Sequence, residues 1–307
     1  MKYVPLGNSN LSVPAIGIGC MRMNRLNVKQ ADRFVRSCIE WGATYFDHAD
    51  MYKGGECERL FGQILQNHSD LRDNIFLQSK CGIDLRSDKI YNFSKSYIIS
   101  CVEGSLQRLQ TDHLDMLLLH RPDALVEPEE VAEAFEELYT SGKVLHFGVS
   151  NHSPGQIELL KKYLSHPLLV NQLQLSIPMA QMIVSGMEVN RLSEGAINRD
   201  GDVLNYCRIN DVTIQAWSPF QGPDKKCFLG NPAFEELNQV LEDLAKEHHV
   251  TAAAVAAAWI LRHPAKMQVI SGSMDLDHTQ QILAATSFTL NRQEWYQIYK
   301  AAGYILP

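Results

Sequence analysis

Four side chains that can take part in proton transfer lie at or just past the ends of three successive apolar runs. These side chains are Asp47, Tyr52, Lys80 and His120. The runs cover residues 44–46, 75–79 and 114–119. Each run is brief and bounded by polar or turn residues, which is typical of a buried strand. A helical stretch separates each run from the next, so the strands are predicted to be parallel neighbours whose C-terminal ends share one face.

The four residue types suit the donation of a proton to a developing alkoxide. A tyrosine phenol has a pKa of about 10, and a lysine ammonium beside it favours the phenolate and lowers that pKa. A lysine at the mouth of an apolar barrel tends to lose its charge unless a carboxylate pairs with it, and Asp47 lies on the adjacent strand. His120, one strand further, could hydrogen-bond the same substrate oxygen. The set therefore predicts the chemistry of carbonyl reduction.

Taken singly, each of these residues has an ordinary structural explanation. A tyrosine in a loop commonly packs or faces solvent, a Lys–Asp pair is commonly structural, and a buried histidine is commonly a hydrogen-bonded core residue. That structural explanation is kept for the neighbouring His48, Asp50 and Arg121. The joint placement of the four at three adjacent strand ends favours a shared chemical role over accident.

Composition and charge exclude several classes of protein. The 307 residues are 45% hydrophobic and 21% charged, an ordinary globular mixture. A formal net charge of −7 argues against nucleic-acid binding, and no apolar stretch is long enough to span a bilayer. Seven cysteines without a C-x-x-C pair or metal spacing indicate reduced thiols and no metal site. The N-terminus lacks a signal-peptide core, so we expect a cytoplasmic protein.

Strand and helix patterns alternate along the chain, after a turn at 7–9 that predicts an opening hairpin. Further strands are predicted at residues 15–19, 144–149, 168–173, 212–217 and 267–270. Helices are predicted at 28–41, 57–65, 128–139, 154–164, 203–210, 234–248, 252–262, 278–285 and 292–302, and after an N-cap at Ser94. Residues 178–202 have no clear period and are predicted to be irregular. Eight such strands predict one (β/α)8 TIM barrel over residues 1–307, with an N-terminal β-hairpin.

A doubly wound parallel sheet is the main alternative fold. Such a sheet would need a glycine fingerprint after its first strand. Here Gly17-Ile18-Gly19 is followed by Cys20-Met21-Arg22, so the G-x-G-x-x-G pattern fails. The barrel is therefore favoured.

Six motifs in order along the whole chain resemble the successive signatures of the aldo-keto reductases. They are F-D-H-A-D-M-Y at 46–52, Q-S-K at 78–80, L-L-H-R-P at 118–122, G-V-S-N at 148–151, N-Q at 171–172 and W-S-P at 217–219. The chain is similar in particular to bacterial oxidoreductases of this family that carry F-D-H-A-D-x-Y and a short C-terminus. The resemblance implies a barrel that reduces a carbonyl with a nicotinamide cofactor bound in extended form.

The same resemblance implies a role for each matching residue. Tyr52 would be the general acid, Lys80 and Asp47 would tune it, and His120 would orient the substrate. Residues implied to bind the cofactor are Ser150, Asn151 and Gln172 at the carboxamide, Trp217 against the nicotinamide ring, Ser218 and Pro219 at the pyrophosphate, and Ser271, Gly272 and Ser273 at the adenosine phosphate.

The phosphate end departs from the family pattern. Where the family usually has an arginine, this chain has His278, with Asp275 and Asp277 close by. Imidazole does not grip a phosphate bidentately, and the two carboxylates would repel a 2′-phosphate. We therefore expect a weaker preference for NADPH over NADH than in the family at large, with NADP(H) still the favoured cofactor and NAD(H) not excluded.

The expected partner is a small carbonyl substrate, with no nucleic acid and no membrane. An open substrate pocket is predicted to be lined by Met21, Arg22, Met51, Lys53 and the residues after His120, which indicates broad tolerance more than tight selection. The alternative function is a nicotinamide-binding, redox-sensing regulatory subunit with little turnover, because the family includes potassium-channel β-subunits. A different chemistry on the same barrel face also stays open. The sequence does not indicate an oligomeric state.

Overall fold

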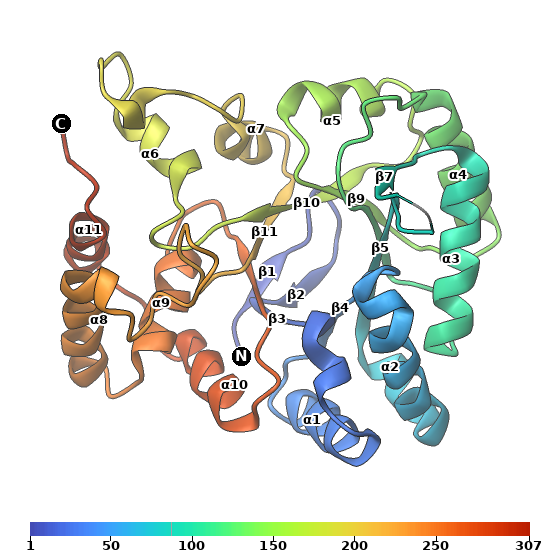
Figure 1. Ribbon diagram of the computed structural model, residues 1–307, viewed down its shortest axis with the longest axis horizontal. Coiled ribbons are helices and arrows are strands. Elements are labelled where there is room, and N and C mark those ends of the chain that lie inside the picture. Colours follow the sequence, from blue (N-terminus) through green and yellow to red (C-terminus); the bar gives the residue numbers. More distant parts are fainter. Residues whose placement is uncertain (87) are drawn as a thin grey trace.

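Eight parallel strands close into a barrel with helices around it (Figure 1). The computed structural model describes residues 1–86 and 88–307. In order around the barrel the strands are β10 (Leu168–Gln174), β11 (Thr213–Trp217), β12 (Gln268–Ser271), β3 (Ile16–Gly19), β4 (Tyr45–Asp47), β5 (Phe76–Cys81), β8 (Met116–Leu119) and β9 (Phe147–Ser150). The predicted (β/α)8 fold is confirmed.

The helices form the outer layer of the barrel (Figure 1). They are α1 (Val28–Glu40), α2 (Glu56–Asn67), α3 (Lys95–Leu109), α4 (Pro128–Thr140), α5 (Pro154–Lys161), α6 (Gln181–Met187), α7 (Val203–Ile209), α8 (Glu235–Glu247), α9 (Ala252–Leu261), α10 (Leu276–Leu283) and α11 (Arg292–Ala301). Their apolar faces pack on the outer faces of the strands as one continuous core. Among the described residues, no helix is both long and apolar enough to cross a membrane.

The predicted hairpin, β1 (Tyr3–Pro5) and β2 (Ser12–Pro14), covers the N-terminal end of the barrel. Leu6 and Val13 pack there against Tyr45, the first residue of β4. The Gly7 amide also donates to Oγ1 of Thr213, the first residue of β11, at 2.7 Å. Because the hairpin closes this end, only the C-terminal end of the barrel is left open for a site.

Two stretches differ from the sequence prediction. The segment 178–202, predicted to be irregular, contains helix α6, whose Met182, Ile183 and Val184 are buried. Seven residues are too few to show a helical period, which explains why the pattern was not recognised. A short hairpin of β6 (Ile83–Asp84) and β7 (Ile90–Tyr91) was also not predicted. Lys80 lies inside β5 rather than past its end, because the strand continues pairing with β8 as far as Cys81.

A layer of glutamines crosses the barrel interior beneath its open end. Gln215 Nε2 donates to Gln268 Oε1 at 2.8 Å and to the hydroxyl of Tyr45 at 2.9 Å. Gln215 Oε1 accepts from Nε2 of Gln78 at 3.0 Å and of Gln172 at 2.9 Å. All five side chains are buried. Such a layer is stable because its amides satisfy one another, which links strands β4, β5, β10, β11 and β12.

The turn that carries Tyr52 is held by helix α2. Tyr52 begins a short 3-10 turn in which Lys53, Gly54 and Gly55 all have positive φ, and α2 follows directly. Buried Glu58 of α2 accepts from Ser79 Oγ at 2.6 Å and forms an ion pair with Arg108 of α3 at 2.7 Å. The position of Tyr52 therefore depends on how closely α2 approaches α3 and β5.

Gly62 permits that close approach. A Cβ atom at Gly62 would lie 2.1 Å from the carbonyl oxygen of Arg108, a backbone atom that cannot rotate away. We predict that Gly62→Ala lowers the free energy of unfolding by about 1–3 kcal/mol, as overpacking of a tight contact does. The midpoint of urea unfolding, followed by circular dichroism, measures this loss.

Gly186→Ala is the matched control for this prediction. Gly186 also lies in a helix, α6, but a Cβ atom there has nothing within 4 Å. We expect this variant to be unchanged or up to about 1 kcal/mol more stable. Equal stability of the two variants would contradict the proposed tight contact between α2 and α3.

Candidate active site

A cavity of about 300 Å³ opens at the C-terminal end of the barrel. Predicted site residues that line it are Asp47, Tyr52, His120, Ser150, Asn151, Gln172, Trp217, Ser218 and Gly272. Met21, Arg22 and Met51 also line it as expected, whereas Lys53 does not. The predicted residues that lie outside the lining are Lys80, Pro219, Ser271, Ser273 and His278. Most of the predicted residues, which come from strands far apart in the chain, are thus brought to one cavity.

Asp47 and Lys80 form a buried ion pair at the base of this cavity. Lys80 Nζ lies 2.5 Å from Asp47 Oδ1 and also donates to the carbonyl oxygen of His48 at 2.7 Å. Burial alone would lower the pKa of Lys80, but the charge of Asp47 and the hydrogen bonds that Lys80 makes raise it above its ordinary value. Lys80 is therefore an ammonium group at neutral pH.

The glutamine layer fixes the carboxylate of Asp47. Oδ1 of Asp47 also accepts from Nε2 of Gln78 at 2.5 Å and from Nε2 of Gln172 at 3.2 Å. A buried carboxylate is stable only when such donors replace the water it has lost. The sequence prediction did not include Gln78 or Gln215 in the site. Their signal is a polar amide in the interior of a strand.

Tyr52 lines the cavity with its hydroxyl beside Lys80. Lys80 Nζ donates to the Tyr52 hydroxyl at 3.2 Å and lies 5.1 Å from the centre of its ring. Burial raises the pKa of Tyr52 above 10, and the opposing effect of Lys80 is smaller. The expectation that Lys80 lowers this pKa below its ordinary value is therefore wrong for the protein without ligands. The reason is that desolvation of the phenolate outweighs its attraction to an ammonium already paired with Asp47.

His120 faces Tyr52 across the cavity, with ring centres 5.9 Å apart and planes at 81°. Burial, helped by the positive charges of Lys80, Arg121 and Lys89, lowers the pKa of His120 well below 6.5. The imidazole is thus neutral at physiological pH. A neutral imidazole can donate one hydrogen bond to a substrate oxygen, but it is not a source of a proton under these conditions.

Amide and hydroxyl groups cluster on the opposite wall. Asn151 Nδ2 donates to Ser150 Oγ at 2.7 Å and to the carbonyl oxygen of His120 at 3.3 Å. Trp217 Nε1 donates to Asn151 Oδ1 at 3.1 Å, so the indole is held at the cavity wall. Together with Gln172, these groups offer paired donors and acceptors and one aromatic surface, which fits a carboxamide-bearing aromatic ring.

The residues at and after the end of β12 offer fewer groups for a polar ligand than the amide wall does. Ser271 Oγ is buried and has no hydrogen-bond partner among the described residues. A Cβ atom at Gly272 would lie 2.7 Å from Arg22 Nη1, so glycine lets the guanidinium approach this backbone. His278 is 71% exposed, and its Nδ1 lies 3.7 Å from Oδ1 of Asp275. A phosphate near His278 would therefore lie close to the carboxylate of Asp275.

Two further cations, Arg121 and Lys89, line the cavity. Arg121 does so as expected for the residues after His120, although a structural explanation was kept for it, whereas Lys89 was not predicted. His48 and Asp50, for which the same explanation was kept, do not line the cavity. Burial lowers the pKa of His48 to about 3 and raises the pKa of Asp50 to about 7.

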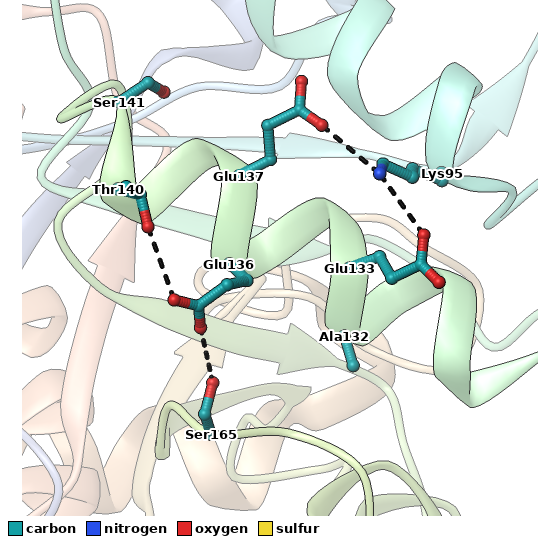
Figure 2. A pocket seen from close by; sticks show the side chains of 8 residues that line it. All are labelled: Lys95, Ala132, Glu133, Glu136, Glu137, Thr140, Ser141 and Ser165. Carbon is teal, nitrogen blue, oxygen red and sulfur yellow. Dashed lines mark hydrogen bonds and ion pairs between the residues drawn. The ribbon is translucent and has the colours of Figure 1, made fainter.

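A second hollow lies on the outer surface, over α4 and away from the barrel mouth (Figure 2). Its charged groups already have partners: Lys95 contacts Glu133 at 3.2 Å and Glu137 at 3.4 Å, and Glu136 accepts from Ser165 at 2.7 Å. None of the predicted site residues lies there. Among the described part of the chain, no group of three or more His, Cys, Asp or Glu could hold a metal ion.

Comparison with known proteins identifies the family of the chain. A model of the aldo/keto reductase family matches residues 15–302. The chain is 39% identical over 303 residues to the uncharacterized oxidoreductase YcsN of Bacillus subtilis, covering 94% of each protein. It is 36% identical over 289 residues to the oxidoreductase YdhF of Escherichia coli, covering 92% of this chain and 91% of that protein.

Two further comparisons extend this agreement. The chain is 34% identical over 275 residues to a 6-dehydroglucose reductase of Agrobacterium fabrum, covering 87% of this chain and 86% of that protein. The fold matches the crystal structure of a thermostable aldo-keto reductase in complex with the inhibitor epalrestat, with a TM-score of 0.78 and 24% identity over 98% of this chain and 100% of that one. The family match over nearly the whole chain and the identity to these relatives show that the chain belongs to the aldo/keto reductase family.

Proposed function

We propose that the protein reduces an aldehyde or ketone to an alcohol with a reduced nicotinamide cofactor, and that residues 1–307 act as one reductase domain. The observation that carries the proposal is the Tyr52 hydroxyl at the cavity, 3.2 Å from an ammonium that is itself paired with Asp47. Family membership and relatives named as oxidoreductases support the general reaction. The seven free thiols fit the reducing environment of the cytoplasm, where we propose that it acts.

In this proposal Tyr52 is the general acid. As the carbonyl carbon gains a hydride, negative charge develops on the carbonyl oxygen, and the Tyr52 hydroxyl transfers its proton to that oxygen. The resulting phenolate is stabilised by the Lys80 ammonium beside it. The neutral His120 donates a hydrogen bond that orients the same oxygen. Asp47 keeps Lys80 charged and in place without contacting the substrate.

The cofactor would be held by the amide wall and the ends of β11 and β12. Ser150, Asn151 and Gln172 would bind its carboxamide, and Trp217 would stack on its ring. Its pyrophosphate and adenosine phosphate would be bound by Ser218, Pro219, Ser271, Gly272, Ser273 and His278. The cofactor supplies the hydride that the carbonyl carbon accepts. NADP(H) is the favoured form, because it is typical of the family.

Replacing the general acid tests the proposal directly. We predict that Tyr52→Phe lowers kcat for reduction of an activated aromatic aldehyde by about 10²–10⁴-fold, the usual contribution of a positioned acid. Cofactor affinity is expected to stay close to that of the unmodified protein, because the phenol does not lie on the amide wall. Loss of absorbance at 340 nm measures turnover, and quenching of tryptophan fluorescence measures cofactor binding. Cofactor binding without turnover in the unmodified protein would favour the regulatory-subunit alternative.

The pKa directions predict the pH dependence of reduction. The acid must be protonated, so kcat falls as pH rises through the pKa of Tyr52, which is raised above 10. His120 must be neutral, so the fall in kcat that follows its protonation lies well below pH 6.5. We therefore predict a flat kcat between about pH 6.5 and about pH 9.5 at saturating cofactor. A titration midpoint near pH 7 would show that another group donates the proton.

The cofactor preference can be tested at Asp275. This carboxylate accepts from the backbone amide of His278 at 2.8 Å and caps α10, and asparagine caps a helix equally well. We predict that Asp275→Asn tightens NADPH relative to NADH by about 2- to 10-fold, because one screened negative charge is removed near the 2′-phosphate. Dissociation constants for both cofactors measure the ratio. An unchanged ratio, or a hundredfold preference for NADPH in the unmodified protein, would contradict the proposed repulsion.

A further inference from the structure

Three positive side chains line the cavity, and among the described residues none is paired with a carboxylate. One of them, Arg22, donates to the carbonyl oxygen of Gly272 at 3.3 Å, whereas the other two leave their donors unused. Arg121, directly after His120, and Lys89, at the end of the β6–β7 hairpin, both line the cavity. Within the described ranges 1–86 and 88–307, neither forms an ion pair or donates a side-chain hydrogen bond; their contacts are with aromatic rings. Arg121 Cζ lies 5.7 Å from the ring centre of Trp217, and Lys89 Nζ lies 5.9 Å from that of Tyr91.

The carboxylates in this region are engaged elsewhere. Asp47, the one carboxylate among the described lining residues, is paired with Lys80. Asp84 forms an ion pair with Arg86. Asp123 accepts from the backbone amides of Phe93 and Leu125 at 2.9 and 2.8 Å. The cavity mouth therefore carries positive charge that the protein itself does not neutralise.

This charge lies beside the residues that the proposed reaction would use. Arg121 follows β8 and Lys89 follows β5, and the guanidinium of Arg121 extends to Trp217 at the end of β11, where the nicotinamide ring is expected. Both cations line the same cavity as Tyr52 and His120, where the carbonyl would be reduced. Their expected ligand is thus part of the substrate rather than of the cofactor.

The N–H groups of the Arg121 guanidinium have no acceptor among the described residues, and they suit one class of ligand well. These planar N–H donors fit the two oxygens of a carboxylate, and such charge-assisted bonds are about twice as strong as neutral ones. Stacking on an aromatic ring orients the guanidinium but uses none of these donors. Lys89, which is more exposed, would add a weaker and more strongly screened attraction.

We propose that the substrate is an aldehyde or ketone that also carries a carboxylate, and that Arg121, assisted by Lys89, binds this carboxylate while Tyr52 and His120 engage the carbonyl oxygen. This inference rests on the proposed reductase function. Arg121 acts as a specificity-determining residue: it selects the charged substrate and takes no part in proton transfer.

A pair of substrates that differ only in charge tests the inference. The ratio of kcat/KM for 4-formylbenzoate to that for its uncharged methyl ester is measured in the unmodified protein and in variants. We expect Arg121→Gln to lower this ratio about 10- to 100-fold, Arg121→Lys to restore part of it, and Lys89→Gln to lower it about 3-fold. Raising the salt concentration should lower the ratio in the unmodified protein.

Arg86→Gln is the matched control. It removes a positive charge from the neighbouring segment, but Arg86 is paired with Asp84 and does not line the cavity. We expect the ratio in this variant to match that of the unmodified protein. A fall as large as that in Arg121→Gln would show that net charge, rather than a binding contact, sets the preference, and would overturn the inference.

A binding measurement separates failure of this inference from failure of the proposed function. Calorimetric titration with the two alcohols, 4-(hydroxymethyl)benzoate and its methyl ester, in the presence of NADP⁺ requires no turnover. Tighter binding of the carboxylate that is lost in Arg121→Gln supports the anion site. If neither aldehyde is reduced in that case, the proposed reductase function is wrong but the anion site is not. Equal affinity for acid and ester, or a preference unchanged in Arg121→Gln, overturns the anion site whether or not the protein is a reductase.

Discussion

The buried ion pair between Asp47 and Lys80 is the interaction on which the rest of the site depends. Its two charges are almost completely removed from water, so each is stable only while the other is present. Removing one partner of such a pair typically costs about 3–5 kcal/mol, because an uncompensated charge remains in the core. The pair therefore keeps an ammonium beside the Tyr52 hydroxyl at all physiological pH values. The resulting positive charge at Tyr52 is a fixed property of the fold rather than a consequence of ligand binding.

The glutamine layer explains how an apolar barrel tolerates this pair. Gln78 and Gln172 both donate to the same oxygen of Asp47 as Lys80 does, and both are held in turn by Gln215. A carboxylate with three donors on one oxygen has little freedom to rotate. Rigid donors and acceptors of this kind stabilise charge without the reorganisation that water would require. The interior of the barrel thus serves both as a core and as the support of the site.

Charge around the cavity is distributed unevenly, and this bears on both ligands. On one side Asp275, which caps α10, places a negative charge near the expected adenosine phosphate. On the other side Arg121 and Lys89 place positive charge beside His120 without a carboxylate partner in the described part of the chain. In the proposed function, the first feature would disfavour an extra phosphate on the cofactor, and the second would favour a negative group on the substrate.

The amino-acid sequence by itself determined the barrel and the neighbourhood that Asp47, Tyr52, Lys80 and His120 share. Apolar strands that alternate with amphipathic helices have few stable arrangements, and a polar residue at the end of each strand necessarily faces the same opening. The sequence did not reveal the pKa of Tyr52, the hydrogen bonds of Asp47 or the unpaired charge of Arg121. They depend on burial and on contacts between residues far apart in the chain, such as the 3.2 Å contact of Gln172 with Asp47. Only the closed tertiary structure, which removes water and brings these side chains together, decided them, because the energies of charged groups depend on their surroundings more than on their identity.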